Sequence, residues 1–174
     1  MRLAFYGGQT AGIITLLTLL ARKQEVAIVI PQDKAVEDLA TLFSLEITAN
    51  TRLNTPHIIK KLKQQVDFLI CCHGKTILQK ELVQQIRCIN LHPCLYKYKG
   101  AKPIKRLLED KNPRASVAAH WMVEKVDAGQ VIVEEFIDIQ NIESKTESQV
   151  YSELYPLYSK IVLMAPEKIN ISSI

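Results

Sequence analysis

The stretch LAFYGGQTAGIITLLTLL, residues 3–20, joins a short apolar run to a longer aliphatic one through two glycines. Residues 3–6 have the length of a buried strand, Gly7 and Gly8 permit a tight turn, and residues 10–20 predict a buried helix. The same order returns when a β-branched run at residues 26–30 ends at Pro31 and apolar residues follow at helical spacing over residues 35–43. A repeated strand–turn–helix order predicts βαβ units.

The alternation continues to about residue 91 and then changes. Apolar spacing predicts helices at 58–66 and 78–85, and unbroken apolar runs predict strands at 67–72 and 87–91. Two strand-like runs, 115–123 and 130–139, are separated only by a polar turn and predict an antiparallel pair, before a closing helix from Thr146 with a kink at Pro156 and a frayed tail at 170–174. We therefore expect one α/β domain over residues 1–174, a Rossmann-like three-layer sandwich whose mostly parallel sheet ends in an antiparallel edge pair.

Composition excludes several classes of protein. A chain of 174 residues with 48% hydrophobic and 23% charged residues is typical of a globular domain, not of a disordered or fibrous one. The net charge of +4 is spread thinly, so no continuous basic stripe indicates a nucleic-acid partner. The amino terminus has no export signal, and the most apolar stretch, residues 11–21, is far shorter than the roughly 20 residues of a membrane span. We expect a cytoplasmic protein without a membrane partner.

Cysteine and histidine patterns do not favour a metal site. Cys71 and Cys72 are adjacent and alternate across a predicted strand, so core packing is favoured over metal ligation. Cys94 is likewise not assigned to a metal or a thiol nucleophile. His57 and His120 have no partner nearby in the sequence, and we interpret both as surface or packing residues.

The first turn could bind an anion at the start of a helix. Its glycines fall at positions 7, 8 and 12 and do not match a dinucleotide-binding motif. Two interpretations stay open: a tight turn with Thr10 as the helix N-cap, or a substrate-binding turn that uses Gly8, Gln9 and Thr10.

The most informative residues end a predicted parallel strand. Asn90 and His92 are two positions apart, so both side chains point to the same side of the sheet, where α/β proteins open a ligand crevice. An amide N–H can donate to an oxyanion, and an imidazole can donate or take a proton near neutral pH. Asp127, in the polar turn before the last strand, could orient the imidazole. From the residues alone, a turn cap at Asn90 and a hairpin start at Asp127 remain an alternative.

Three motifs in order carry a family resemblance. N-L-H-P at residues 90–93, Y-K-G-A-K-P-I at residues 98–104 and M-V-E-K-V-D-A-G at residues 122–129 resemble the formyltransferase family. That family includes glycinamide ribonucleotide transformylase, methionyl-tRNA formyltransferase and the sugar-nucleotide N-formyltransferases. The resemblance is strong over roughly residues 66–137 and weaker before them. It implies a formyltransferase catalytic domain in which Asn90, His92 and Asp127 are the catalytic trio.

The resemblance also implies a donor and a reaction. An acceptor amine would attack the formyl carbon of 10-formyltetrahydrofolate, with Asn90 holding the oxyanion, His92 managing the proton and Asp127 orienting His92. The donor would contact the loop after residue 72 and the turn after residue 121, at His73, Gly74, Lys75, Ile77, Leu78, Met122, Val123 and Val126. Besides the first turn, the acceptor would contact the loop after the active strand, at Tyr98, Lys99, Gly100 and Lys102.

Departures from the family pattern narrow the choice of acceptor. The loop from His92 to Gly100 is one residue shorter than usual and has Cys94 in place of serine, and the first turn lacks the Ser-Asn of glycinamide ribonucleotide transformylases. The chain also ends where methionyl-tRNA formyltransferases begin a second domain, which leads us to expect a small-molecule amine, a nucleotide-linked amino sugar. Phosphoribosylglycinamide formyltransferase and a non-catalytic folate- or nucleotide-binding module are the alternatives. We expect a homodimer, with a candidate interface at the helical stripe of Tyr151, Tyr155 and Tyr158, for which core or surface packing is the alternative.

Overall fold

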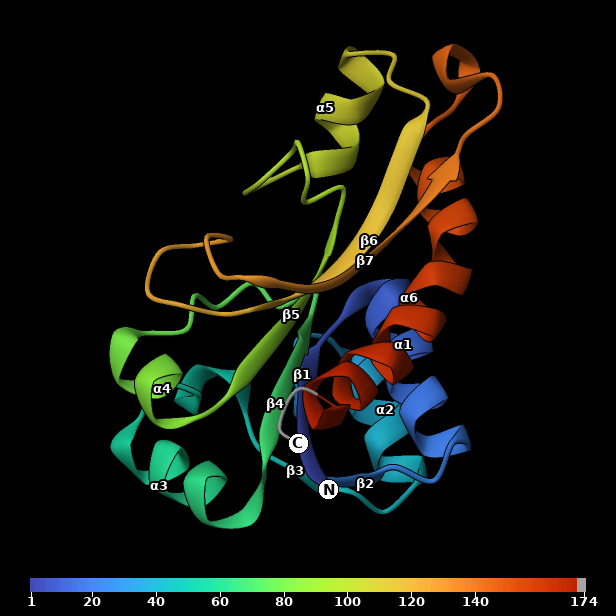
Figure 1. The fold of residues 1–174 in the computed structure, drawn as a ribbon. Helices are drawn as coiled ribbons and strands as arrows, with labels where there is room; N and C mark the ends of the chain where they lie inside the picture. The colour runs from blue at the N-terminus through green and yellow to red at the C-terminus, as the bar shows by residue number, and fades with distance from the viewer. Residues whose placement is uncertain (172–174) are drawn as a thin grey trace.

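The computed structural model describes residues 1–171, and these form a seven-stranded sheet with helices on both faces (Figure 1). The strand order is β3-β2-β1-β4-β5-β6-β7. The pairs among β1 to β5 are parallel, whereas β5–β6 and β6–β7 are antiparallel. The strands are β1 (Arg2–Gly7), β2 (Glu25–Pro31), β3 (Glu46–Ile47), β4 (Phe68–Cys72), β5 (Cys88–Pro93), β6 (Arg114–Trp121) and β7 (Val131–Asp138). The predicted fold class is confirmed, and the short edge strand β3 is an addition to it.

Six α-helices and two 3₁₀ turns within the described residues complete the layers. Helices α1, α2 and α6 cover one face of the sheet and α3 and α4 the other (Figure 1). They are α1 (Gln9–Ala21), α2 (Lys34–Leu42), α3 (Pro56–Gln65), α4 (Lys80–Gln85), α5 (Pro103–Glu109) and α6 (Glu147–Ile171), with η1 (Asn50–Arg52) and η2 (Ile142–Ser144). Within this part of the chain, no helix has both the length and the apolar character that crossing a bilayer would require.

The centre of the sheet is buried on both faces, which explains its unbroken apolar runs. Along β1, Leu3 and Phe5 belong to the core beneath α1 and α6, while Ala4 and Tyr6 belong to the core beneath α3 and α4. The two cysteines of β4 divide in the same way, and all four cysteines are buried and free. The core-packing interpretation of Cys71 and Cys72 therefore agrees with their alternation across the strand.

The closing helix α6 packs on β6, β7 and α1. Tyr158 is fully buried, and Tyr151 and Tyr155 pack against the same core, so this stripe faces the molecule's own interior. The core-packing alternative therefore describes how these tyrosines lie within this chain. Helix α6 continues through Pro156 and includes residues 170 and 171, which corrects the expected tail; residues 172–174 lie outside the described residues.

Candidate active site

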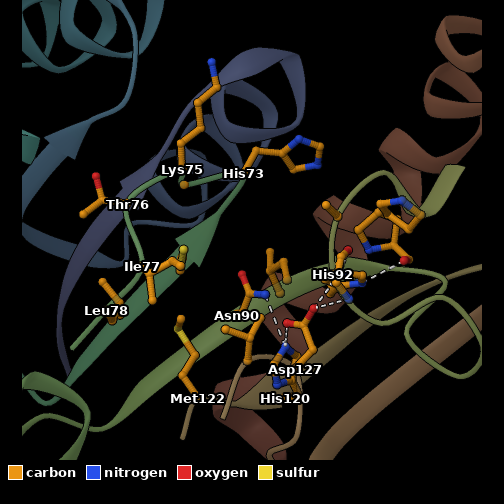
Figure 2. A pocket seen from close by; sticks show the side chains of 18 of the residues that line it. His73, Lys75, Thr76, Ile77, Leu78, Asn90, His92, His120, Met122 and Asp127 are labelled. Carbon is orange, nitrogen blue, oxygen red and sulfur yellow. Dashed lines mark hydrogen bonds and ion pairs between the residues drawn. The ribbon is translucent and has the colours of Figure 1, made fainter. Parts of the chain in front are cut away.

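A pocket of about 470 Å³ lies at the carboxyl ends of β1, β4 and β5, where open α/β sheets bind ligands. Its walls come from the loop after β4, the end of β5, the loop before α5, the β6–β7 connection and the first turn of α6. Figure 2 shows Asn90, His92 and Asp127 together in this pocket. The structure thus brings together three residues that are up to 37 positions apart in the sequence.

Strand β5 places the amide and the imidazole. Asn90 and His92 lie two residues apart near its end, so both side chains point into the pocket. Because β5 is parallel to β4 on one side and antiparallel to β6 on the other, it lies at the change of direction in the sheet. His92 is only 8% exposed, which strengthens its electrostatic contacts.

A tight loop brings Asp127 to this strand end. Asp127 has a φ of 52°, in the left-handed region, and an added Cβ on Gly129 would lie 1.7 Å from the carbonyl oxygen of Trp121. Glycine is therefore required where this loop folds back against β6. The Asp127 carboxylate accepts a hydrogen bond from the backbone N–H of Gly100 at 2.7 Å, so it also holds the loop that follows β5.

Both ring nitrogens of His92 face oxygen atoms. Its Nδ1 lies 2.8 Å from the carbonyl oxygen of Pro93, and its Nε2 lies 3.0 Å from the Asp127 carboxylate and 3.2 Å from the carbonyl oxygen of Gly100. These oxygens can only accept hydrogen bonds, so both ring nitrogens must donate for every contact to be satisfied. Both nitrogens are therefore directed at acceptor oxygens, one of which belongs to a carboxylate.

Asp127 is held in its charged form. Burial raises the pKa of its carboxyl, but the contacts with His120 and His92, the charge of His92 and the Gly100 N–H together outweigh that effect. The net result is a pKa well below the ordinary aspartate value. Asp127 therefore remains a carboxylate throughout the neutral pH range and can stabilise a positive charge on His92.

His120 joins this cluster, which corrects its interpretation as a surface or packing residue. It is 1% exposed, and its Nε2 lies 3.2 Å from Asn90 Nδ2 and 3.5 Å from an Asp127 carboxylate oxygen. The antiparallel register pairs Asn90 directly with His120. The one sequence signal that could have found it is its position in a strand next to β5, but the register was not readable from the sequence.

All eight residues assigned to the donor line the pocket. The wall from the loop after β4 carries exposed Ile77, and the opposite wall from the β6–β7 connection carries exposed Val126. Apolar side chains on two facing loops suit a flat ring between them, with backbone groups free to read its polar edge. The eight are His73, Gly74, Lys75, Ile77, Leu78, Met122, Val123 and Val126.

The side chains of Tyr6 and Gln32 hold the loop after β4 in place. The Tyr6 hydroxyl accepts the Thr76 N–H at 2.6 Å and donates to Gln32 Oε1 at 2.9 Å, and the same Gln32 oxygen accepts the Lys75 N–H. Farther along, the side chain of Asn54 donates to the Ile77 carbonyl. The loop is therefore shaped before any ligand binds, which lowers the entropy cost of binding.

Replacing Gly74 with alanine is expected to disturb this wall. The new Cβ would lie 2.2 Å from a ring carbon of Tyr6, a fully buried side chain that cannot move aside. We expect a loss of about 1–3 kcal/mol in the free energy of unfolding and a higher KM for the donor. Thermal melts and steady-state kinetics would measure both. Lys75→Ala is the control for stability, because it shortens an exposed side chain in the same loop; equal melting temperatures for the two variants would contradict the prediction.

His73 links this loop to α6 and to the first turn. Its Nδ1 contacts Gln9 Oε1 at 2.8 Å, its Nε2 contacts the Tyr158 hydroxyl at 2.8 Å, and its ring meets the edge of Tyr151. Burial, with a smaller contribution from the charge of His92, lowers the pKa of His73 to about 4. The ring is therefore neutral at physiological pH, and the Gln9 oxygen accepts the proton of Nδ1 while Tyr158 donates to Nε2.

This histidine should make stability depend on pH. Between its ordinary pKa of 6.5 and the folded value of about 4, the unfolded chain binds a proton that folded His73 excludes. The free energy of unfolding should therefore fall as the pH drops through that window. His73→Asn, which tolerates the positive φ of 57° at this position, should remove this part of the slope in denaturant titrations. The exposed His57→Asn is the control, and a slope unchanged in His73→Asn would refute the assignment.

The first turn differs from the expected anion site. Gln9 lines the pocket, but Gly8 and Thr10 do not, and Thr10 is not the N-cap of α1. The backbone N–H of Gln9 donates to the carboxylate of Asp33, which also caps α2 through the Val36 N–H. A negative charge from the protein itself therefore occupies the amino end of α1, where a phosphate would meet repulsion.

Only some of the residues predicted to contact the acceptor from the loop after β5 line the pocket. Gly100 and Lys102 line the pocket, whereas Tyr98 and Lys99 do not. Tyr98 is 4% exposed in the core, and its hydroxyl donates to Asp110 at 2.9 Å. The structure therefore places Tyr98 as a packing residue that anchors this loop, because its large ring finds more apolar contact in the core than in the pocket.

Comparison with known proteins agrees with this arrangement. Residues 6–164 match the family model described as formyl transferase. The chain is 29% identical over 157 residues to methionyl-tRNA formyltransferase of Syntrophomonas wolfei, covering 81% of this chain and 50% of that protein. It is 32% identical over 108 residues to the enzyme of the same name from Thermotoga maritima, covering 61% of this chain and 34% of that one. The chain thus spans half the length, or less, of these curated relatives.

Solved structures show the same fold. Phosphoribosylglycinamide formyltransferase from Campylobacter jejuni superposes with a TM-score of 0.79 at 22% identity, covering 97% of each chain. A likely sugar N-formyltransferase from Mycobacterium tuberculosis superposes with a TM-score of 0.74 at 18% identity, covering 99% of this chain and 68% of that one. The fold and the strand-end pocket therefore define an open α/β ligand-binding protein. With the match over residues 6–164, the chain belongs to the formyl transferase family.

Proposed function

We propose that this chain transfers the formyl group of 10-formyltetrahydrofolate to the primary amine of an acceptor. The observation that carries the proposal is the convergence of Asn90, His92 and Asp127 at the floor of a pocket with two apolar facing loops. A 470 Å³ pocket is of a size that holds a drug-sized ligand, and the walls at Ile77 and Val126 suit its flat ring. The donor supplies the formyl carbon.

The three residues divide the work of acyl transfer. One N–H of Asn90 donates to the formyl oxygen as negative charge develops on it. The acceptor amine loses a proton, and the nitrogen that leaves the formyl carbon gains one. His92 carries this proton from the first nitrogen to the second, so one C–N bond forms as another breaks and the protons balance. Asp127 keeps its charge at neutral pH and stabilises the protonated ring at 3.0 Å. These roles require no metal ligand.

For the acceptor, we propose a nucleotide-linked amino sugar. The pocket lining that is not assigned to the donor or to the catalytic trio includes Gln9, Lys102, Glu147 and Tyr151. An amide, an ammonium group, a carboxylate and an aromatic ring together suit a hydroxylated ring, since hydroxyl groups both donate and accept hydrogen bonds. The carboxylate of Asp33 disfavours the binding of an acceptor's phosphate group at the first turn.

A second candidate acceptor is methionyl-tRNA, which the names of the curated relatives favour. This chain spans half the length of the first of them, so a tRNA acceptor would require contacts beyond the part that the two proteins share. A net charge of +4 over 174 residues supplies little of the attraction that a polyanion needs. The two acceptors therefore have to be compared directly.

The test is an absorbance assay for tetrahydrofolate release from the donor. Amino-sugar nucleotides, methionyl-tRNA and glycinamide ribonucleotide are supplied separately, with His92→Ala beside the wild type. Release that depends on one acceptor and is lost in the variant supports the proposed reaction and identifies the acceptor class. Tight folate binding without release in any mixture would instead support a non-catalytic folate-binding module and overturn the proposal.

A further inference from the structure

A buried imidazole faces the amide that the proposed reaction uses. His120 lies on β6 at 1% exposure, directly across from Asn90 in the antiparallel register. The strand around it is otherwise apolar, with Ala118 and Ala119 fully buried just before it. Burying a polar ring costs free energy unless its nitrogens find partners, so its contacts indicate what the ring is for.

The first contact determines the tautomer. Nδ1 of His120 lies 2.9 Å from the carbonyl oxygen of Trp121, which can only accept a hydrogen bond. Nδ1 therefore carries the proton, and in the neutral ring Nε2 is a bare acceptor. That acceptor lies 3.2 Å from Nδ2 of Asn90 and farther, at 3.5 Å, from the Asp127 carboxylate.

A bare Nε2 selects one orientation of the Asn90 amide. The amide group can rotate by half a turn and exchange its NH₂ for its oxygen with little change in shape. An acceptor at Nε2 favours the NH₂, as Figure 2 shows by the line from Asn90 to His120. One N–H then donates to His120, and the second remains for the substrate. In the other orientation, the amide oxygen would face both Nε2 and the developing oxyanion, and both contacts would be repulsive.

We propose that His120 is a positioning residue that keeps the NH₂ of Asn90 directed at the formyl oxygen. The inference rests on the proposed function for its effect on turnover, but the orientation itself is a property of the free protein. His120 does not touch the reacting atoms and acts through Asn90.

Two matched variants separate positioning from packing. His120→Gln keeps an acceptor oxygen near the position of Nε2, whereas His120→Asn keeps a donor near Nδ1 and removes the acceptor. We expect His120→Asn to lower kcat by about 10- to 100-fold with little change in either KM, and His120→Gln to recover most of that loss. Equal kcat values in variants with equal melting temperatures would overturn the proposal.

A double-mutant cycle tests whether the effect passes through Asn90. In an Asn90→Ala background, the further change His120→Asn should cost almost nothing, because the group that it positions is already gone. An undiminished loss in that background would show that His120 acts elsewhere and would contradict the inference. Melting temperatures of all four proteins show whether any loss arises from unfolding.

A measurement without an acceptor keeps the inference independent of the proposed function. In ¹⁵N-labelled protein, the two side-chain amide protons of Asn90 should differ, because one donates to His120 and exchanges slowly with solvent. The Asn90→Ala spectrum assigns the pair. His120→Asn should abolish the slow exchange and His120→Gln should retain it. Equal exchange of both protons in the wild type would overturn the inference even if formyl transfer is found, and the expected pattern would support it even if no acceptor is found.

Discussion

Replacing Asn90 with leucine or aspartate is expected to lower turnover by about 10²- to 10³-fold, the range found when one oxyanion donor is removed. Leucine matches the size of the side chain but carries no donor. Aspartate matches its shape even more closely, but it presents only acceptor oxygens to an atom that is becoming negative. Substrate binding should change much less than kcat, because the lost hydrogen bond strengthens as charge develops during the reaction.

Steady-state kinetics with the acceptor that the release assay identifies would check this expectation. Aspartate should be at least as damaging as leucine, because charge repulsion adds to the lost donor. The reverse order, or a loss confined to KM, would show that Asn90 binds substrate and does not stabilise the reaction. Melting temperatures must be measured in parallel, because Asn90 also donates to His120 and its loss leaves a buried acceptor without a partner.

Replacing Asp127 with asparagine is expected to lower turnover by about 10²- to 10⁴-fold. This range covers the loss of general acid–base catalysis and the loss seen when a catalytic histidine is wrongly oriented. The carboxylate accepts a hydrogen bond from the backbone N–H of Gly100, and it lies 3.0 Å from Nε2 of His92 and 3.5 Å from Nε2 of His120. An amide removes the negative charge, and its NH₂ group would oppose a donating ring nitrogen. His92 would then lose the partner that stabilises its protonated form.

Asp110→Asn is the matched control for that variant. The pKa of Asp110 is also lowered, chiefly by hydrogen bonds from Lys97 and Tyr98, but this carboxylate lies outside the pocket lining. It should leave kcat within a few-fold of the wild type. Similar losses in the two variants would indicate a general effect of removing a carboxylate, and Asp127 would lose its specific role.

Asp127→Asn should also change how the free energy of unfolding responds to acid. The folded pKa of Asp127 is below its ordinary value of 3.8, so the carboxylate contributes stability that is fully present above about pH 4 and is lost as the pH falls further. The stability difference between wild type and Asp127→Asn should therefore shrink in acid. Denaturant titrations at pH 7 and at pH 3 would measure it. A difference that stays constant or grows at pH 3 would contradict the lowered pKa.

Much of the site could be predicted from local patterns. Asn90 and His92 face one side because side chains alternate along a strand, and this holds in any extended segment whatever its neighbours. The loops after β4 and β6, which the family resemblance assigned to the donor, both line the pocket. Apolar spacing also located α6, whose Leu154 and Ile161 are buried in the core.

Other residues depended on contacts between distant segments. His120 was missed because its role depends on the register between β5 and β6, which strand-to-strand hydrogen bonds set across 30 positions. The carboxylate of Asp33 reaches the first turn from just after β2, 24 positions away, and no local sequence pattern indicates this contact. Apolar spacing along a helix does not always predict burial, since Leu42 follows the apolar pattern of α2 yet is 78% exposed.

The sequence by itself determined the order of strands and helices, the parallel sheet with its antiparallel edge, and the side of β5 that carries the amide and the imidazole. These depend on the periods of strand and helix, which each segment carries within itself. Only the tertiary structure decided that His120 lies against Asn90, that Asp33 occupies the amino end of α1 and that Tyr98 packs in the core. Register, burial and charge neighbours arise when distant segments pack together, so no single segment specifies them.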